Sequence, residues 1–243
     1  MKFYAQINSP LGAMLLSSNG THLEGLYFAG QNDCPIVDGL PAVKPGKADP
    51  TAGMMAGAAI KNFKAYKTRI EPDLFNDQDL RPTGLNAPSD AGKRLTPDRL
   101  QSGAATATAG ETPQHLVLMQ TDTPDGTVHL FEQTQSELKE YFDGSRQVFT
   151  MPIHLDGTEF QKKVWQALLT IPYGEYVSYG DVALAAGLTA QHGRPVGTAV
   201  GRNPLTIIVP CHRVLASSGR LNGYTGGLER KFALLELEGF TLS

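Results

Sequence analysis

Apolar and polar residues alternate along the first thirty residues of the chain, as they do in strands that bury one face. Turn-forming residues interrupt the alternation twice, at 10–12 and again at Asn19-Gly20, which is a favoured hairpin pair. We therefore expect a small antiparallel sheet at this end of the chain. Its strands are expected at 2–7, 13–17 and 22–28.

Apolar residues recur at helical spacing in the second half of the chain. This spacing predicts a helix over 135–142, and a further strand is predicted over 149–155. A longer helix is expected after Thr158, which is a good capping residue and precedes five apolar residues on one helical face. These five are Phe160, Val164, Trp165, Leu168 and Leu169.

Two short helices are expected next, over 178–187 and 194–200, joined by a glycine-containing turn. Such a pair matches a helix-turn-helix, whose second helix normally enters a groove of DNA. Helical hairpins of this size are also common in proteins that do not bind DNA. The pattern alone therefore leaves both interpretations open.

The segment 31–127 has a different character, since ten of the sixteen prolines fall within it and its aromatic residues are few. Stretches such as 82–91 and 102–113 are too polar and too rich in helix breakers to offset the entropy of ordering. We interpret the segment as a long, mostly disordered insertion within one small N-terminal domain, 1–30 and 128–155. An independent second domain is the alternative.

Composition narrows the class of protein. The chain of 243 residues is 41% hydrophobic, enough for a core, and has neither a membrane-length apolar run nor a secretory signal, which predicts a cytoplasmic protein. It has two cysteines, and neither lies in a spacing typical of zinc sites. Cys34 is interpreted as an unreactive free thiol, because a disulfide to Cys211 would not persist in a reducing compartment.

Charge is unevenly distributed. The net charge of the chain is -3, but the segment 190–231 holds six basic residues and one acidic residue, a local charge of +5. A basic segment of this kind favours contact with a polyanion such as nucleic acid.

Cys211 follows an apolar run, 205–209, that predicts a buried extended segment ending at this cysteine. A free thiol with a pKa of about 8.5 is only slightly ionised at neutral pH, so a nucleophilic cysteine needs an adjacent base. His212 is the neighbouring base, and a carboxylate must orient its imidazole. Spacing alone does not choose among three downstream carboxylates, Glu229, Glu236 and Glu238.

The sequence around Cys211 resembles a known family. Pro210-Cys211-His212-Arg213, preceded by Asn203-Pro204 and an Ile/Val run and followed by a glycine-rich turn at 223–227, is similar to the core of the O6-alkylguanine-DNA alkyltransferases. The resemblance covers 158–239 closely and the N-terminal domain weakly. It implies an α+β fold with a ribonuclease-H-like antiparallel sheet domain and a mostly helical C-terminal domain, 156–243, that contains a helix-turn-helix.

The resemblance also implies roles for five residues of the reaction. Cys211 matches the alkyl acceptor, His212 its water-bridged base, and Glu238 the carboxylate that polarises the histidine. Asn203 matches the residue that braces the helix-turn-helix against the active-site turn. Tyr179 matches the phenol that contacts the flipped guanine and supplies a proton to it.

Further residues match the DNA contacts and the pocket. Arg194 matches the arginine that fills the base stack, and Arg202 is assigned to DNA contact, while Arg220 and Arg230 are interpreted as solvated charges. Two departures affect the aim of Arg194: Pro195 follows it, and the connection 188–193 is about one residue longer than in many relatives. Four residues match the substrate pocket: Val209, Pro210, Tyr224 and Thr225.

The function implied is repair of DNA by direct reversal of damage. An alkyl group on O6 of guanine, or on O4 of thymine, would move irreversibly to Cys211, so that each molecule acts once and needs no cofactor or metal. The implied partner is double-stranded DNA with alkylated bases. The protein is expected to bind it as a monomer and to have no membrane partner. The alternatives are a non-enzymatic binder of alkylated guanine, a transcriptional regulator and a cysteine hydrolase.

Overall fold

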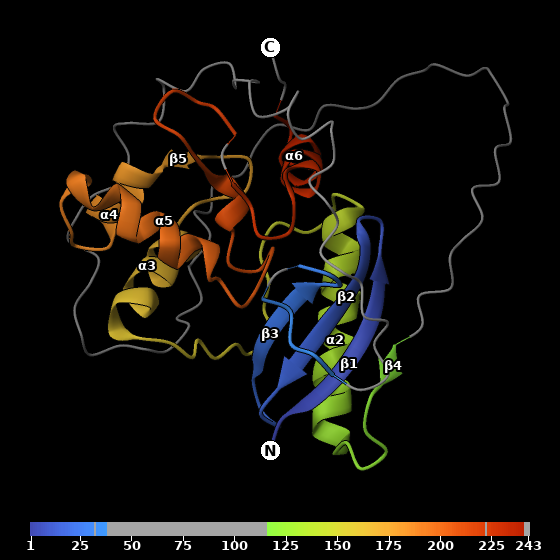
Figure 1. Ribbon diagram of the computed structural model, residues 1–243. Helices are drawn as coiled ribbons and strands as arrows, with labels where there is room; N and C mark the ends of the chain where they lie inside the picture. The colour runs from blue at the N-terminus through green and yellow to red at the C-terminus, as the bar shows by residue number, and fades with distance from the viewer. Residues whose placement is uncertain (32, 38–115, 222, 241–243) are drawn as a thin grey trace, which may run out of the picture. The chain divides into compact units, whose positions relative to one another are not determined.

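The computed structural model of the chain describes residues 1–31, 33–37, 116–221 and 223–240 (Figure 1). Its fold is α+β, with an antiparallel sheet in the N-terminal part and helices in the C-terminal part. The expected insertion lies mainly outside the described residues, so that interpretation and its domain boundaries stay predictions. Within the described ranges, no helix combines the length and apolar character that crossing a bilayer requires.

The N-terminal sheet confirms the alternation read from the sequence. Strand β1 pairs with β2 along its whole length, and β2 pairs with β3. Gly12 closes the first turn at a φ of +111°, a conformation that residues with a side chain rarely adopt. A fourth, short strand gives the order β3-β2-β1-β4. The strands are β1 Phe3–Ser9, β2 Gly12–Ser18, β3 Leu23–Phe28 and β4 Val117–Leu118.

Helix α2 (Asp125–Phe142) packs against β1 and runs along the sheet, as Figure 1 shows. It begins well before the expected residue 135. Three of its seven buried residues are polar, namely Thr127, Thr134 and Glu137, so apolar spacing alone underestimates its length.

The strand predicted over 149–155 is wrong. Within this segment, all of which is described, the one bridge joins Ile153 to Leu23. The difference is explained by Glu137 of α2, whose buried carboxylate accepts hydrogen bonds from the backbone N–H of Thr150, at 2.7 Å, and from the Thr150 hydroxyl. The start of the segment is therefore held by a helix side chain and not by a strand ladder.

Helices α3 (Glu159–Leu169) and α4 (Tyr179–Ala185) confirm the prediction of helices in these regions. Both begin with a capping box, in which the N-cap hydroxyl and the side chain three residues later each bond the other's backbone N–H. These bonds satisfy donors that the first helical turn leaves unpaired. The pairs are Thr158 with Gln161 and Ser178 with Asp181.

Helix α5 (Gly193–Gly201) follows α4 after a 3₁₀ turn at Ala190–His192. The buried Trp165 fastens α3 to α5, because its indole Nε1 donates to the Ala199 carbonyl at 2.8 Å. The three helices pack against one another, and their buried residues belong to the same hydrophobic cluster as Cys211.

The last part of the chain adds elements that the sequence reading did not identify. Strands β5 (Val177–Ser178) and β6 (Val214–Leu215) form a short parallel pair, and helix α6 (Leu228–Leu237) ends the described fold. A 3₁₀ turn, Cys211–Arg213, leads directly into β6. Cys211 is thus held between α5 and a strand.

Candidate active site

Cys211 begins a tight turn and is 6% exposed. The preceding run 205–209 was expected to be extended, and this is wrong at its centre. Ile207 adopts a φ of +74°, and Val209 N–H donates to the Leu205 carbonyl at 2.8 Å. The run is buried as expected, but it folds back on itself. The prediction failed because the apolar character of a run indicates burial and does not indicate the sign of its backbone φ angles.

Asn203 holds this turn. Its amide Nδ2 donates to the Val209 carbonyl at 2.7 Å and to Sγ of Cys211 at 3.0 Å, and its Oδ1 accepts from the backbone N–H of Leu205 at 3.0 Å. Asn203 is buried. One side chain therefore joins the end of α5, the apolar run and the sulfur.

The protonation of Cys211 is set by opposing effects. Burial raises the pKa of the thiol, while the Asn203 hydrogen bond and the positive charge of Lys231 lower it, and burial is the largest. Lys231 lies fully buried in α6 with its Nζ 2.6 Å from the Val214 carbonyl, and burial lowers the pKa of its ammonium to about 8. The resting sulfur is therefore a thiol, and a base must remove its proton.

His212 supplies a base with a defined tautomer. Its Nε2 lies 2.9 Å from Oε1 of Glu238, and both side chains are fully buried. An ionised carboxylate only accepts hydrogen bonds, so Nε2 carries the proton and Nδ1 presents its lone pair. Nδ1 is buried and has no hydrogen-bond partner among the described residues. Burial lowers the pKa of His212, although Glu238 opposes this, so the imidazole is neutral.

Glu238 is the most heavily bonded group of the site. It accepts from His212, from the Nε and Nη2 of Arg213 at 2.9 Å each, from the Tyr141 hydroxyl at 2.8 Å and from the Gly174 N–H at 3.3 Å. Burial alone would raise the pKa of this carboxyl, but the hydrogen bonds and charges of His212 and Arg213 outweigh it and lower the pKa to about 2. Glu238 therefore stays ionised across the physiological range.

The two tyrosines expected at the pocket both lie close enough to Cys211 to interact with it electrostatically. Burial raises the pKa of Tyr179 and, more strongly, that of Tyr224, so both are neutral phenols. The Tyr224 hydroxyl is buried and has no partner among the described residues. The neighbouring Thr225 hydroxyl donates to the Gly201 carbonyl at 2.6 Å, which ties this loop to the end of α5.

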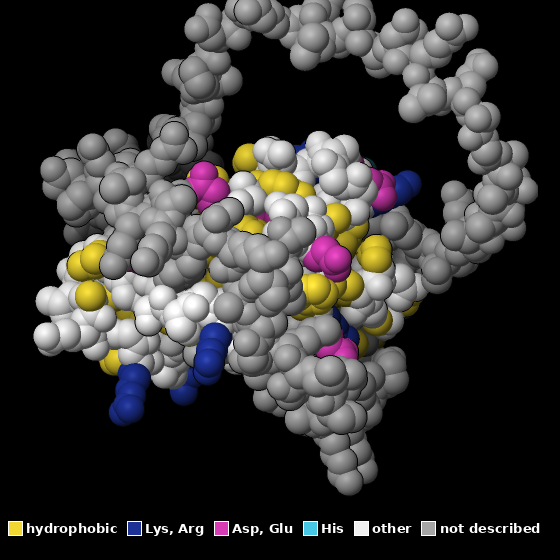
Figure 2. Space-filling view, turned by 90° about the horizontal axis from the view of Figure 1, so that it is seen from above, with side chains coloured by type: hydrophobic (Ala, Val, Ile, Leu, Met, Phe, Trp, Pro, Cys, Tyr) yellow, Lys and Arg dark blue, Asp and Glu magenta, His cyan; other side chains and the backbone are white. Residues whose placement is uncertain are grey.

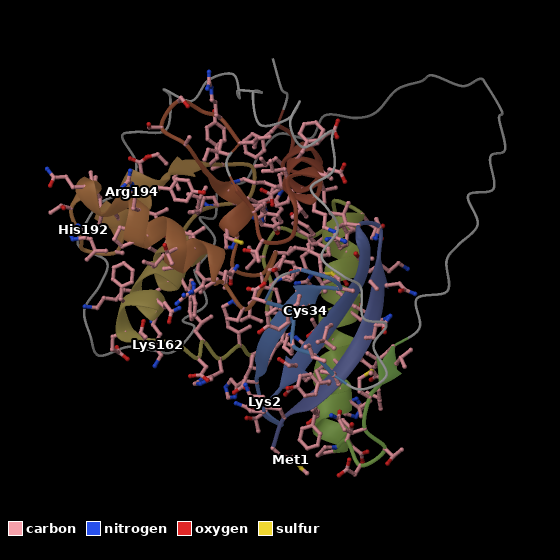
Figure 3. The ribbon with its side chains drawn as sticks, viewed as in Figure 1. Met1, Lys2, Cys34, Lys162, His192 and Arg194 are labelled. Carbon is pink, nitrogen blue, oxygen red and sulfur yellow. The ribbon has the colours of Figure 1, made fainter. Side chains whose placement is uncertain are left out.

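Arg194 lies apart from the buried groups, on the exposed start of α5 (Figure 3). It lines an open depression of about 470 Å³, which Tyr179 and Thr198 also line. Arg202, at the end of α5, is exposed as well. Tyr179 thus connects the depression to the surroundings of Cys211.

The basic segment 190–231 does not form the exposed patch that its charge suggested. Arg213 and Lys231 are buried, and Arg230, interpreted as a solvated charge, is half-buried with two internal hydrogen bonds. On the face in Figure 2, Lys and Arg side chains project at several places, some of them near one another at its lower left edge. Arg194, Arg202 and Arg220 are the exposed members of the segment.

Sequence reasoning gave no role in the site to three residues. Arg213 was quoted in the Pro-Cys-His-Arg motif and Lys231 was counted as a charge. Tyr141 lies 97 residues from its partner Glu238, in a helix assigned to the other domain. Cys34, expected to be an unreactive thiol, is free and partly buried. Among the described residues, no group of three or more His, Cys, Asp or Glu is arranged to hold a metal.

Known proteins share this sequence and fold. Residues 159–240 match the family model described as "6-O-methylguanine DNA methyltransferase, DNA binding domain". A methylated-DNA–protein-cysteine methyltransferase of Mycobacterium leprae is 56% identical over 108 residues, 44% of this chain and 65% of that protein. The protein of the same name from Mycobacterium bovis is 52% identical over 116 residues, 48% of this chain and 68% of that protein.

A solved structure extends the similarity beyond the matched segment. The crystal structure of Mycobacterium tuberculosis OGT in complex with DNA is 30% identical, covers 96% of this chain and 90% of that chain, and has a TM-score of 0.55. Fold and site together define a protein with a buried cysteine, next in sequence to a histidine that a carboxylate orients, on an α+β scaffold. The chain belongs to the methylated-DNA–protein-cysteine methyltransferase family.

Proposed function

We propose that this chain repairs DNA by transferring an alkyl group from O6 of guanine, or from O4 of thymine, to Sγ of Cys211. The observation that carries the proposal is the arrangement of a buried thiol bonded to Asn203 beside an imidazole whose Nε2 is fixed by Glu238. Membership of the family supports the reaction class, and the geometry supports the assignment of the acceptor. Each protein molecule acts once, since these groups provide no route to cleave a thioether.

The proton balance of the reaction follows from the site. Nδ1 of His212 accepts the thiol proton through one bridging water, and the sulfur then forms a bond to the alkyl carbon as the bond from that carbon to O6 breaks. The electrons of the broken bond remain on the guanine, which takes up a proton from Tyr179. The raised pKa of Tyr179 keeps that proton on the phenol until the guanine leaves. The proton held by His212 then returns to the Tyr179 phenolate through solvent. One thiol and one alkylguanine thus give one thioether and one guanine, and no cofactor is consumed.

DNA handling is assigned to the α4–α5 pair. We interpret this pair as a helix-turn-helix in which Arg194 enters the base stack after the damaged base is extruded, and Arg202 contacts the DNA. The exposed position of Arg194 beside a depression that Tyr179 also lines supports this role. The DNA complex solved for the Mycobacterium tuberculosis protein supports DNA as the partner. Extrusion is required because a paired base cannot expose its O6-alkyl group.

Several finer expectations belong to the same proposal. The sheet and α2 belong to a ribonuclease-H-like domain, expected over 1–30 and 128–155 and followed by the transfer domain 156–243. Strand β4 and the start of α2 lie before residue 128, so the second part of this domain begins earlier than the sequence predicted. Val209, Pro210, Tyr224 and Thr225 line the guanine pocket, and burial of the first two agrees with a closed wall. The protein acts as a monomer in the cytoplasm, and the segment 31–127 takes no part in the chemistry.

One experiment tests the acceptor. The protein is incubated with duplex DNA that carries O6-methylguanine, and peptide mass mapping locates the methyl group. We expect one methyl per protein molecule, on the peptide that contains Cys211, and none after Cys211→Ala, while Cys34→Ala reacts normally. Repeated turnover, or methylation of Cys34, would contradict the proposal.

A further inference from the structure

Arg230, in the first turn of α6, joins three parts of the chain. Its Nε donates to the Leu11 carbonyl in the β1–β2 turn at 2.9 Å, and its Nη1 donates to the Gly226 carbonyl at 2.8 Å. Its guanidinium also lies over the ring of Phe28 in β3, 4.5 Å from the centroid. A side chain of the transfer domain is therefore bonded to the N-terminal sheet and to the loop that precedes α6.

The loop in question carries Tyr224, and it is closely fitted. A Cβ atom added to Gly226 would lie 2.7 Å from Cε1 of Tyr224 and 3.0 Å from Cδ2 of Phe28, so the two rings flank this glycine. The contact on the sheet side is somewhat looser but still tight, since a Cβ on Gly12 would lie 3.3 Å from Nη2 of Arg230. The loop that carries Tyr224 therefore packs against Phe28 at the end of β3, and the Arg230 guanidinium contacts both the loop and Phe28.

A solvated, phosphate-contacting arginine would leave its donors in water. Arg230 instead is half-buried and directs two donors to backbone carbonyls, and burial lowers the pKa of its guanidinium. The planar guanidinium donates to two acceptors at once while its flat face covers the Phe28 ring. A lysine ammonium cannot make both kinds of contact. These contacts hold the Arg230 side chain in one position, as expected for a residue that supports a loop and not for a mobile charge on the surface.

We propose that Arg230 is a positioning residue for the alkyl-transfer reaction, which fastens the Tyr224–Gly227 loop to the N-terminal sheet so that the wall of the guanine pocket stays closed. This inference rests on the proposed function for the pocket itself. It gives the N-terminal sheet a task in substrate binding although the sheet contributes none of the reacting groups.

The test compares Arg230→Met, which keeps the packing on Phe28 but removes both hydrogen bonds, with Arg230→Lys and with the exposed control Arg220→Met. Three quantities are measured: backbone hydrogen exchange over 223–227, the concentration dependence of the reaction with free O6-benzylguanine, and the rate at which iodoacetamide modifies Cys211. Iodoacetamide needs no guanine pocket, so it reports the thiol alone.

For Arg230→Met we expect faster exchange confined to 223–227, about tenfold weaker binding of O6-benzylguanine, and an unchanged iodoacetamide rate. Arg230→Lys should fall between Arg230→Met and the wild type, and Arg220→Met should match the wild type. Unchanged exchange over 223–227 overturns the inference. So does exchange that rises throughout the described chain, because the role is then general stability. If wild-type protein fails to react with O6-benzylguanine or methylated DNA, the proposed function fails, while the exchange measurement still decides whether Arg230 holds the loop.

Discussion

The groups around Glu238 and the groups around Arg194 are held in opposite ways. Glu238 is buried and accepts five hydrogen bonds from four residues, and three of these partners, Tyr141, His212 and Arg213, are themselves buried. Arg194 is exposed at a helix start, beside an open depression. The difference fits the division of tasks that we propose. Proton transfer at Cys211 would require a geometry set in advance, whereas contact between Arg194 and DNA would require a side chain that moves into place.

Glu238→Gln should have the largest effect among these variants. The amide no longer compensates the buried Arg213 or fixes the His212 tautomer, so we expect transfer to slow by about 100-fold or more. Breaking a buried ion pair should also cost about 3 kcal/mol or more of stability. The measurements are single-turnover kinetics with O6-benzylguanine and thermal unfolding. The control is Glu236→Gln, an exposed position in the last turn of α6, two residues before Glu238. Equal behaviour of the two variants would remove Glu238 from the mechanism.

The pH dependence sharpens this prediction. His212 must be neutral to accept a proton, and burial lowers its pKa, so the wild-type rate should be level down to about pH 6.5 and fall at lower pH. Glu238 raises the pKa of His212, so in Glu238→Gln the acid limb should move to lower pH while the plateau rate falls. The pKa of Glu238 is itself lowered to about 2, so the stability it contributes is present above its unfolded pKa of about 4.3 and is lost as the pH falls towards 2. If the acid limb of the pH–rate profile moved to higher pH in Glu238→Gln, the assignment of His212 as the base would be contradicted.

Arg194→Ala should separate DNA handling from chemistry. Extruding a base costs a few kcal/mol, and loss of the inserted side chain should slow repair of duplex DNA by about tenfold or more. Free O6-benzylguanine needs no extrusion, so its rate should be unchanged. Arg202→Ala, which removes the proposed contact of Arg202 with DNA, should instead weaken binding in a salt-dependent manner. Equal slowing of duplex and free base by Arg194→Ala would show that the arginine acts on the pocket.

Tyr141→Phe should have a smaller effect. It removes one of the five bonds to Glu238 and leaves the other four, so we expect a loss of about 1.5 kcal/mol of stability and a rate reduced a few-fold. Tyr173→Phe is a matched control, since the Tyr173 ring lies against Tyr141 and its hydroxyl donates to the uncharged Leu237 carbonyl at 3.0 Å. Unfolding in urea and transfer kinetics measure both variants. A Tyr141→Phe protein indistinguishable from the Tyr173 variant would show that the bond to Glu238 contributes nothing specific.

Replacing residues 38–115 by a flexible linker should have the smallest effect. The site residues described here all lie outside this segment, so transfer of a methyl group should stay within about twofold of the wild type. Single-turnover repair of methylated duplex DNA is the measurement, and circular dichroism checks that the shortened protein folds. A folded deletion protein without transfer activity would place part of this segment in the working site.

The sequence was sufficient for the parts of the site that lie close together along the chain. Cys211 and His212 are adjacent, and the resemblance placed Asn203 and Glu238 beside them, where the structure also has them. Tyr141 could not be predicted, because the helix that carries it has a partly polar buried face and lies in the other part of the sequence.

Charge counting failed for a related reason. Formal charge is the same for a solvated arginine and a buried one, so the segment 190–231 appeared to be a basic surface. Three of its six basic side chains are instead used internally, by Glu238, by backbone carbonyls and by packing around Cys211. Only the positions of partners distant in sequence reveal this. The helix caps, by contrast, depend on residues three apart, and they were readable at Thr158 and Ser178.

The left-handed backbone at Ile207 has a consequence for protein engineering. Glycine is the usual stabilising substitution at a positive φ, since it removes backbone strain of about 1–3 kcal/mol. At Ile207 it would also delete a side chain that is 1% exposed and whose burial is worth about 1.5–3 kcal/mol, and it would increase the freedom of the unfolded chain. The usual gain should therefore vanish here. Among the residues that the structure describes, Ile207 is the non-glycine residue with a positive φ. A search for thermostable variants that ranks sites by backbone angle alone would therefore select a position where glycine brings no net stability.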